Sequence, residues 1–358
     1  MTKTATYDSP ATRSTVGQRL AERGWVPDAM IRAAIRRLLH TRLADEYGAG
    51  GDGLQRRQVE FHRSLAVGPI AVATERANAQ HYEVPAAFYS EVLGDRRKYS
   101  SGYWPDGVAD LTAAEEAMLA LTCQRAGIED GMDVFDLGCG WGALTLWIAE
   151  KYPNVTVVAL SNSRSQRESI EATAAERGLR SVRVETADIN SFDTELRFDR
   201  VVSVEMFEHM RNWDALLARV AMWLRPDGRA LVHTFCHREL AYPYETERDD
   251  DWMGRFFFTG GIMPSVDTLP SFDHDLVTQD QWRVSGMHYA DTARAWLDNL
   301  DHRRDRILPI LEQCYGADQG SVWHGRWRLF FMACEELFRF RGGEEWFVSH
   351  TLLGHRTR

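Results

Sequence analysis

The segment VSVEMFEHM places two carboxylates and an imidazole within five residues. Glu205 ends a β-rich run, and Glu208 and His209 follow three and four positions later, on one face of a helical turn. Carboxylates can orient a cation, and an imidazole, with an ordinary pKa of about 6.5, can accept a proton near neutral pH. The group could therefore bind an ammonium ion and deprotonate it. The same pattern also fits a helix cap and a core histidine, so neighbouring motifs must decide.

A second stretch, VFDLGCGWGAL, predicts a ligand site. The strand VFDL meets a helix that begins near Gly142, and parallel α/β sheets bind ligands beyond such strand ends. Gly138 and Gly140 permit close backbone approach and positive φ. The dinucleotide pattern G-x-G-x-x-G fails here, as does the P-loop, which needs Gly-Lys-Ser/Thr. An acid two residues before G-x-G, here Asp136, is typical of S-adenosylmethionine binding.

Polar residues at the ends of the next two strands extend this prediction. Ser161, Asn162 and Gln166 can hydrogen-bond ribose hydroxyls, although the acid usual at that strand end is missing. Asp188 can meet the adenine amino group, and Ile189 can cover the ring. The order and spacing of these motifs are those of a class I methyltransferase.

The elements around these motifs alternate between short β-rich runs and helical segments. Such alternation predicts a parallel sheet covered on both faces, with right-handed crossovers. We therefore expect an α/β, Rossmann-like class I methyltransferase fold with a mostly parallel seven-stranded sheet, plus helical N-terminal and lid and helical C-terminal additions. The helices of the core are expected at 142–151, 163–177 and 213–224.

Composition and spacing divide the chain into four expected parts. They are a disordered tail (1–15), a helical N-terminal cap (16–111), a cofactor-binding core (112–237), and a region with lid, remaining strands and C-terminal helices that forms the substrate pocket (238–358).

Local patterns refine these parts. The glycine-rich YGAGGDG is expected to interrupt the N-terminal helices, and a helix at 112–126 is expected to be capped by Thr112 with Glu115 completing a capping box. Aromatic and acidic residues at 238–285 indicate an insertion or lid, and helical patterning continues from 290 to about 341.

The whole-chain composition excludes several function classes. A formal net charge of −10 disfavours binding to nucleic acid or to an anionic membrane. No apolar run approaches the ~20 residues of a membrane span, and the N-terminus has no apolar signal core. Five scattered cysteines favour a reducing cytoplasm without disulfides or a metal site. Lysine is almost absent beside arginine, which indicates a GC-rich, bacterial genome.

Five stretches together carry a family resemblance: YSSGYW, GCGWGALTLWIA, LSNSRSQ, VSVEMFEHM and HTFCHRELAYPYE. With them, almost the entire chain resembles the cyclopropane fatty acid synthase superfamily, and most of all its coclaurine N-methyltransferase branch, which methylates tetrahydroisoquinoline alkaloids. The resemblance implies S-adenosylmethionine as cofactor and S-adenosylhomocysteine as product. It also implies that Tyr99 and Ser100 meet the methionine carboxylate. The catalytic positions of the family fall on Glu205, Glu208 and His209.

Two departures bear on the substrate. Lipid-cyclopropanating members hold bicarbonate with Cys, Glu, His and Tyr, and the resemblance places these on Ser101, Glu208, His233 and Tyr289. The serine in place of cysteine disfavours the lipid alternative, a cyclopropane-fatty-acyl-phospholipid synthase acting on unsaturated chains. The Phe-Pro-x-Gly of the lid reads Phe258-Thr259-Gly260-Gly261 here.

The remaining expectations concern the acceptor. The acidic run Glu245–Asp251 fits a solvated loop or a funnel for cations. The partner is expected to be a small cyclic or aromatic amine, with no nucleic acid, no stable membrane association, and a possible homodimer. The side chains expected to contact this amine are Tyr82, His233, Phe257, Tyr289, Trp323, Trp327 and Phe330.

Overall fold

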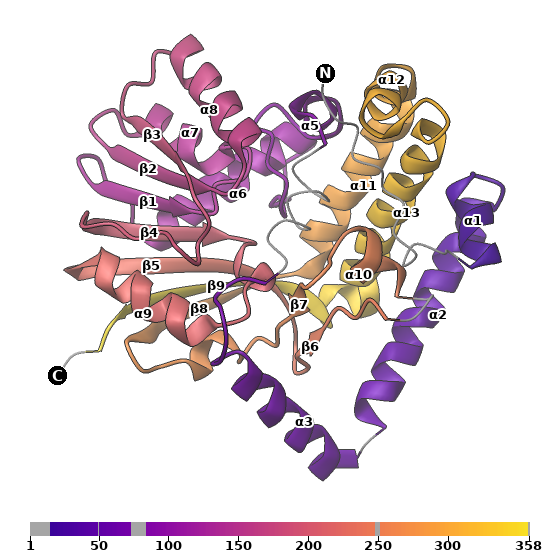
Figure 1. Cartoon of the computed structure of the whole chain (residues 1–358), viewed down its shortest axis with the longest axis horizontal. Coiled ribbons are helices and arrows are strands. Elements are labelled where there is room, and N and C mark those ends of the chain that lie inside the picture. Colours follow the sequence, from indigo (N-terminus) through magenta and orange to yellow (C-terminus); the bar gives the residue numbers. More distant parts are fainter. Residues whose placement is uncertain (1–14, 49, 73–83, 248–250, 357–358) are drawn as a thin grey trace.

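A single mixed sheet organises the molecule, and the computed structural model describes residues 15–48, 50–72, 84–247 and 251–356. The sheet has seven strands in the order β3-β2-β1-β4-β5-β9-β8 (Figure 1). Strands β1 to β5 pair in parallel, and β9 runs antiparallel between β5 and β8. The expected mostly parallel, seven-stranded fold is confirmed. The strands are β1 Asp133–Leu137, β2 Thr156–Ser161, β3 Val182–Thr186, β4 Phe198–Val204, β5 Leu224–His237, β8 Leu276–Val284 and β9 Trp346–His355.

Helices cover both faces of the sheet, because successive strand residues point to opposite sides. Val134 of β1 packs with α6 and α7, whereas Phe135 packs with α9 on the opposite face. The helices expected in the core are confirmed to within two residues. They are α6 Leu111–Ala126, α7 Ala143–Lys151, α8 Arg164–Glu176 and α9 Trp213–Trp223.

The capping box expected at the start of α6 is wrong. Asp110, not Thr112, caps the helix, and its carboxylate accepts a backbone N–H of the first turn. Glu115 is used elsewhere: its two oxygens accept the backbone N–H groups of Gly94 (2.9 Å) and Arg96 (3.0 Å). A buried carboxylate thus holds the loop that leads into the YSSGYW motif.

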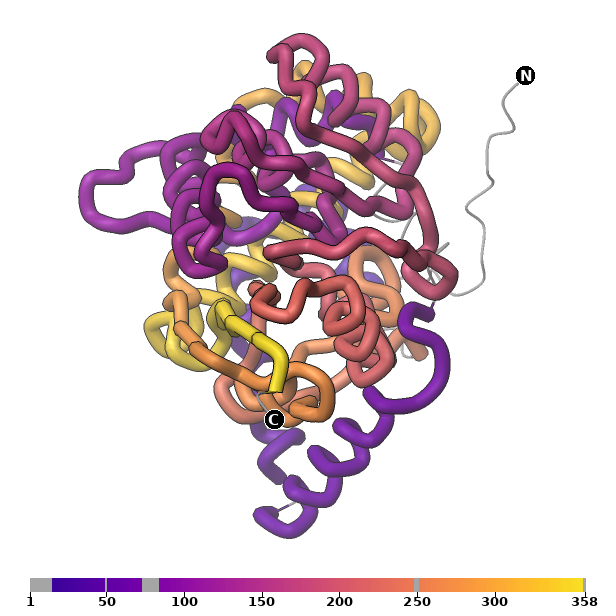
Figure 2. The backbone as a smooth tube through the Cα atoms, turned by 90° about the vertical axis from the view of Figure 1, so that its left-hand side faces the viewer, coloured from indigo at the N-terminus to yellow at the C-terminus, as the bar shows by residue number. Residues whose placement is uncertain are grey.

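Helical segments from both ends of the chain lie beside the sheet. The predicted glycine-rich interruption is confirmed, since α2 ends at Tyr47 and α3 starts at Gly50. In both backbone views, α2 and α3 lie at the periphery of the molecule (Figures 1 and 2). Residues 238–285, the segment expected to be an insertion or lid, also contain β8, which is a strand of the main sheet. The other elements are α1 Val16–Glu22, α2 Asp28–Tyr47, α3 Gly50–Ser64, α5 Ala86–Val92, β6 Tyr242–Pro243, α10 Trp252–Phe256, β7 Ile262–Met263, α11 Gly286–His302, α12 Arg304–Tyr315 and α13 Gly320–Arg339.

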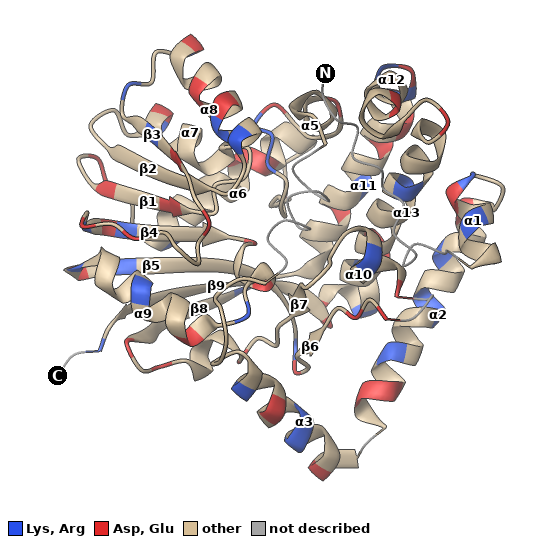
Figure 3. Ribbon diagram, viewed as in Figure 1, with Lys and Arg blue, Asp and Glu red and all other residues tan. Residues whose placement is uncertain are grey.

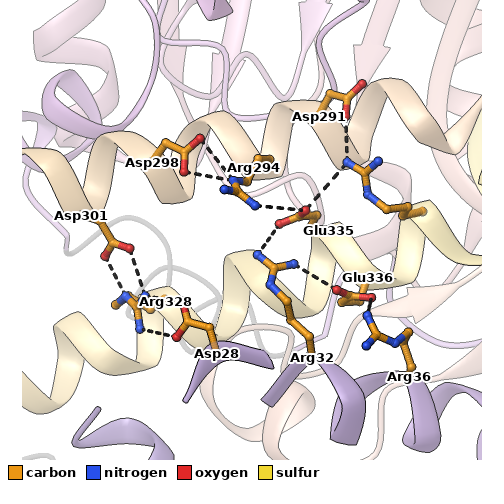
Figure 4. A network of polar contacts seen from close by, with 11 residues as sticks. Asp28, Arg32, Arg36, Asp291, Arg294, Asp298, Asp301, Arg328, Glu335 and Glu336 are labelled. Carbon is orange, nitrogen blue, oxygen red and sulfur yellow. Dashed lines mark hydrogen bonds and ion pairs between the residues drawn. The ribbon is translucent and has the colours of Figure 1, made fainter. Parts of the chain in front are cut away.

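A network of ion pairs docks α2 onto the C-terminal helices (Figure 4). Arg32 of α2 bridges Glu335 (2.7 Å) and Glu336 (3.0 Å) of α13. Arg328 of α13 contacts Asp28 (2.8 Å) and Asp301 (2.7 Å). The two glutamates are buried, so their charges require these arginines. Helix α2 is therefore fixed to the α11–α13 layer that flanks the site.

Charged residues lie mainly on the helices, as along α2 and α3, and the middle of the sheet holds few of them (Figure 3). Among the described residues, no helix combines the length and the apolar character needed to span a membrane.

Candidate active site

One cavity opens at the carboxyl ends of the parallel strands, and all nine residues expected to bind the cofactor line it. Parallel sheets bind ligands at this edge because the turns that follow the strands converge there. The nine are Tyr99, Ser100, Asp136, Gly138, Gly140, Asn162, Gln166, Asp188 and Ile189. Segments from four parts of the sequence thus meet around one volume.

The glycine turn after β1 has the backbone that its sequence predicts. Gly138 and Gly140 both have positive φ, +85° and +52°. A Cβ at Gly138 would lie 2.6 Å from Met206 Cγ, whereas at Gly140 a Cβ would meet no protein atom within 4 Å. Gly140 therefore leaves open space on the cavity wall. The residues fit S-adenosylmethionine, since this open turn can approach a ligand closely.

The acid before this turn is buried. Asp136 accepts a hydrogen bond from the Thr145 hydroxyl (2.6 Å). Burial raises the pKa of Asp136 to about 6, and the Thr145 hydrogen bonds oppose that rise. In the next turn, the Ser161 hydroxyl donates to Gln166 Oε1 (2.6 Å), which leaves the Gln166 amide N–H groups for a ligand.

Replacing Gly140 with valine is expected to weaken S-adenosylhomocysteine binding at least about 10-fold. The new Cβ would stand next to the cofactor positions with no protein atom within 4 Å, and the left-handed backbone would add strain of about 1–2 kcal/mol. Isothermal titration calorimetry measures the affinity. Gly178→Val is the matched control, because Gly178 also has a positive φ (+70°) and open surroundings but lies outside the cavity. Equal affinities in both variants would remove the turn from the cofactor site.

Glu205 lies at the end of β4 and lines the same cavity. Its φ is +48°, a left-handed conformation that costs a non-glycine residue free energy. Oε1 accepts the Ser101 backbone N–H (2.9 Å) and lies 3.2 Å from His233 Nε2, and Oε2 accepts the Tyr289 hydroxyl (2.6 Å). Burial raises the pKa of Glu205, and the Lys98 ammonium and the Tyr289 and Ser101 hydrogen bonds oppose that rise. Three hydrogen bonds thus hold one carboxylate in a strained position.

This arrangement corrects the expected bicarbonate set. The carboxylate that gathers Ser101, His233 and Tyr289 is that of Glu205, not that of Glu208. Ser101 takes part through its backbone N–H, while its hydroxyl donates to the Gly102 carbonyl (3.0 Å). The chain's own carboxylate therefore occupies the place where these groups could hold a separate anion.

The side chains of Glu208 and His209 point in different directions, although we expected them on one face of a helical turn. Both belong to the short 3-10 helix Phe207–His209, in which neighbouring residues point about 120° apart. His209 lines the cavity, with its ring 4.6 Å from the Phe258 ring. Glu208 is fully buried, and its Oε1 accepts the Phe235 backbone N–H (2.7 Å). Within the described part of the chain, Glu208 Oε2 has no hydrogen-bond partner.

Lys98 is a site residue that the sequence reasoning missed. Its side chain is buried, lines the cavity, and donates from Nζ to the Ser100 hydroxyl and the Ser101 carbonyl (2.7 Å). Burial lowers the pKa of Lys98 to about 8, while Glu205 and Glu115 oppose that shift. The sequence did contain one indication of this role: lysine is rare in this arginine-rich chain, and one of its three lysines directly precedes Tyr99.

The residues expected to contact the acceptor divide into three groups. Tyr289 and Phe330 line the cavity. Phe257, Trp323 and Trp327 pack in the adjoining hydrophobic core, and the Phe257 ring stacks on Phe330 at 4.3 Å. His233 lies behind the wall and reaches the cavity through Glu205. Tyr82 lies outside the described residues.

Comparisons with known proteins agree with this geometry. The family model of mycolic acid cyclopropane synthetase matches residues 72–344. The (S)-coclaurine N-methyltransferase of Thalictrum flavum subsp. glaucum is 38% identical over 93% of each chain. The cyclopropane-fatty-acyl-phospholipid synthase of Escherichia coli K12 is 29% identical over 75% of this chain and 66% of its own.

A solved structure of coclaurine N-methyltransferase bound to N-methylheliamine and S-adenosylhomocysteine superposes with a TM-score of 0.89. It is 37% identical and covers 94% of this chain and 98% of that one. The cyclopropane synthase MmaA2 of Mycobacterium tuberculosis has a TM-score of 0.66 at 25% identity, over 79% of this chain and 98% of that one.

The sheet and the cavity at its carboxyl edge define a class I S-adenosylmethionine-dependent methyltransferase. The cofactor is S-adenosylmethionine. More particularly, the chain belongs to the mycolic acid cyclopropane synthetase family and, within it, to the coclaurine N-methyltransferase branch. It is an N-methyltransferase.

Proposed function

We propose that this enzyme methylates the nitrogen of a small cyclic amine fused to an aromatic ring, such as a tetrahydroisoquinoline. The observation that carries the proposal is the Glu205 carboxylate, fixed by three hydrogen bonds on the wall of the cofactor cavity. Oε1 has two hydrogen-bond partners, but Oε2 has only one among the described residues and can accept an N–H from an ammonium ion. An alkene would bring no charge to compensate this buried acid.

The names of relatives support a nitrogen acceptor without fixing it. Besides (S)-coclaurine N-methyltransferase, they include a pavine N-methyltransferase and an (S)-tetrahydroprotoberberine N-methyltransferase, each 33% identical to this chain. Three named acceptors thus occur at similar identity, so the proposal names a chemical class. The occupied anion position around Glu205 argues against the lipid alternative, which would use these groups to hold bicarbonate.

The proposed mechanism assigns separate tasks to the polar residues. An aliphatic amine is mostly ammonium near neutral pH and has no free lone pair until it loses a proton. Glu205 binds this cation and His209 accepts the proton, since both line the cavity. Glu208 is buried outside the cavity lining, so it can act only through the residues that form the wall. S-adenosylmethionine supplies the methyl group on a positively charged sulfur. The side chains contribute chiefly by aligning the nitrogen, since orientation can provide up to ~7–11 kcal/mol.

The cofactor residues keep the roles that the resemblance implies for them in this proposal. Tyr99 and Ser100 hold the methionine carboxylate, and Lys98 fixes the Ser100 hydroxyl and adds a positive charge nearby. Asp188 and Ile189 receive the adenine, and Asn162 and Gln166 the ribose. Phe258 and Phe330 close the apolar side of the cavity and exclude water from the reacting nitrogen.

A substrate panel is expected to show turnover with tetrahydroisoquinolines, measured as S-adenosylhomocysteine release and as N-methyl product by mass spectrometry. The rate should rise from about pH 6 to about pH 8, as the amine and its proton acceptor deprotonate. The raised pKa of Glu205 acts in the same direction, because its ionised fraction increases with pH.

Controls in the same assay are added bicarbonate, which should have no effect, and vesicles of unsaturated phospholipid, which should remain unmodified. Cyclopropane or methyl-branched acyl chains in the vesicles, with no amine converted, would replace this proposal by the lipid alternative.

A further inference from the structure

A row of hydrogen-bonding side chains crosses the sheet behind Glu205 and connects it to α6. His233 Nε2 lies 3.2 Å from Glu205 Oε1, and His350 Nε2 lies 2.9 Å from His233 Nδ1. Arg125 Nη1 lies 2.9 Å from His350 Nδ1. Strand register sets this row, since His233 pairs with Val204 of β4 on one side and with His350 of β9 on the other. No step of the proposed mechanism uses Arg125 or His350.

The row permits one arrangement of protons. A guanidinium has no acceptor, so His350 Nδ1 must accept from Arg125. The proton of a neutral His350 then lies on Nε2 and is donated to His233 Nδ1. By the same reasoning, His233 carries its proton on Nε2 and donates it to Glu205. Both imidazoles are fully buried, and burial lowers the pKa of each well below its ordinary value, so each has a single N–H.

We infer that Arg125 and His350 are positioning residues that, through His233, hold the Glu205 carboxylate ready to bind the substrate ammonium; the inference rests on the proposed function for the role of Glu205. Arg125 fixes the tautomer of His350, and His350 fixes that of His233. Glu205 needs such support, because its backbone is left-handed. His233 also accepts the Glu205 backbone N–H through its carbonyl (2.8 Å), so it holds both ends of this residue.

The direction of the row also bears on where the substrate proton goes. Every N–H in it points toward Glu205, so the row cannot carry a proton away from Glu205 unless both tautomers reverse. Arg125 opposes that reversal, because its N–H occupies His350 Nδ1. The row therefore gives Glu205 no path along which to pass on a proton, so Glu205 orients the cation, and His209, which is outside the row, accepts the proton.

Arg125 is the best position for a test, since it is half-buried, lies outside the cavity, and also covers the Trp282 ring (5.2 Å). Arg125→Gln should lower kcat by about 10- to 100-fold, the range seen for groups that orient a functional side chain. Cofactor affinity and melting temperature should change little. Arg125→Lys retains a donor without an acceptor and should recover part of the loss. Arg200→Gln is the control, since Arg200 also bonds α6, at the Ala126 carbonyl (2.7 Å), but lies off the row.

The second readout is two-bond ¹H–¹⁵N correlation NMR spectroscopy of enzyme labelled with ¹⁵N-histidine. His350→Gln is used to assign the His350 signals. The unsubstituted protein should show His233 and His350 protonated on Nε2, and Arg125→Gln should show mixed tautomers. An Nδ1–H tautomer in the unsubstituted protein, or unchanged kcat and spectra in Arg125→Gln, would overturn the inference. The tautomers are measured without substrate. If no amine in the panel reacts, the proposed function is refuted, but the spectra still test the proton arrangement of the row.

Discussion

Glu205→Gln is expected to lower kcat/KM for the amine by about 10²–10³, with little change in cofactor affinity. Glutamine can occupy the same space: its oxygen can accept from Ser101 and His233, and its NH₂ can donate to the Tyr289 hydroxyl, which can also act as an acceptor. The substitution therefore removes the negative charge and leaves the hydrogen bonds satisfied. A buried ammonium without its counter-charge binds poorly. Steady-state kinetics and calorimetry with S-adenosylhomocysteine measure the two effects.

The control for this substitution is Glu336→Gln. Glu336 is also a buried carboxylate held by charged donors, but it belongs to the α2–α13 network and not to the cavity. Its substitution should affect melting temperature more than kcat/KM. If Glu205→Gln retained nearly full kcat/KM for every amine that reacts, ammonium binding by Glu205 would have to be abandoned.

The second large effect is expected for His209→Ala, which should lower kcat by about 10²–10⁴, the usual range for a general acid–base group. His209 presents its imidazole on the cavity wall, whereas His233 donates to Glu205 in the proposed proton arrangement. Removal of the ring leaves space beside Phe258, so added imidazole should restore part of the activity. Single-turnover rates with and without imidazole measure this result.

Two further variants are needed to interpret the result for His209→Ala. His40→Ala is the control, because the His40 ring also contacts a phenylalanine, Phe340 at 4.9 Å, but lies outside the cavity. Glu208→Gln can keep the hydrogen bond from the Phe235 N–H while removing the acid, and we expect it to lower kcat as well. Near-normal turnover in both His209→Ala and Glu208→Gln would return the two residues to a purely structural role.

Local sequence patterns were enough to predict the sheet and the cofactor side of the cavity. The turn from Asp136 to Gly142 is local, since strand, glycines and helix follow directly in the chain and fix one another's geometry. The alternating elements required parallel strands, and parallel strands bring their following turns to one edge. That is why nine residues chosen from separate motifs line one cavity. Helix boundaries moved by one residue or so, and the expected capping box of α6 failed because Glu115 binds the backbone of another loop.

The acceptor side depended on contacts that no local pattern contains. Glu205 and Glu208 are three residues apart and look equivalent in the sequence, but only Glu205 meets the donors of Ser101, Tyr289 and His233, which lie 104, 84 and 28 positions away. The link from Arg125 to His350 joins residues 225 positions apart, through the register of antiparallel β9. Hydrogen bonds require atoms within about 3 Å, and for residues this far apart only the packed chain sets that distance. Long-range packing therefore selects which acid faces the cavity, whereas the local sequence ensures that an acid follows β4.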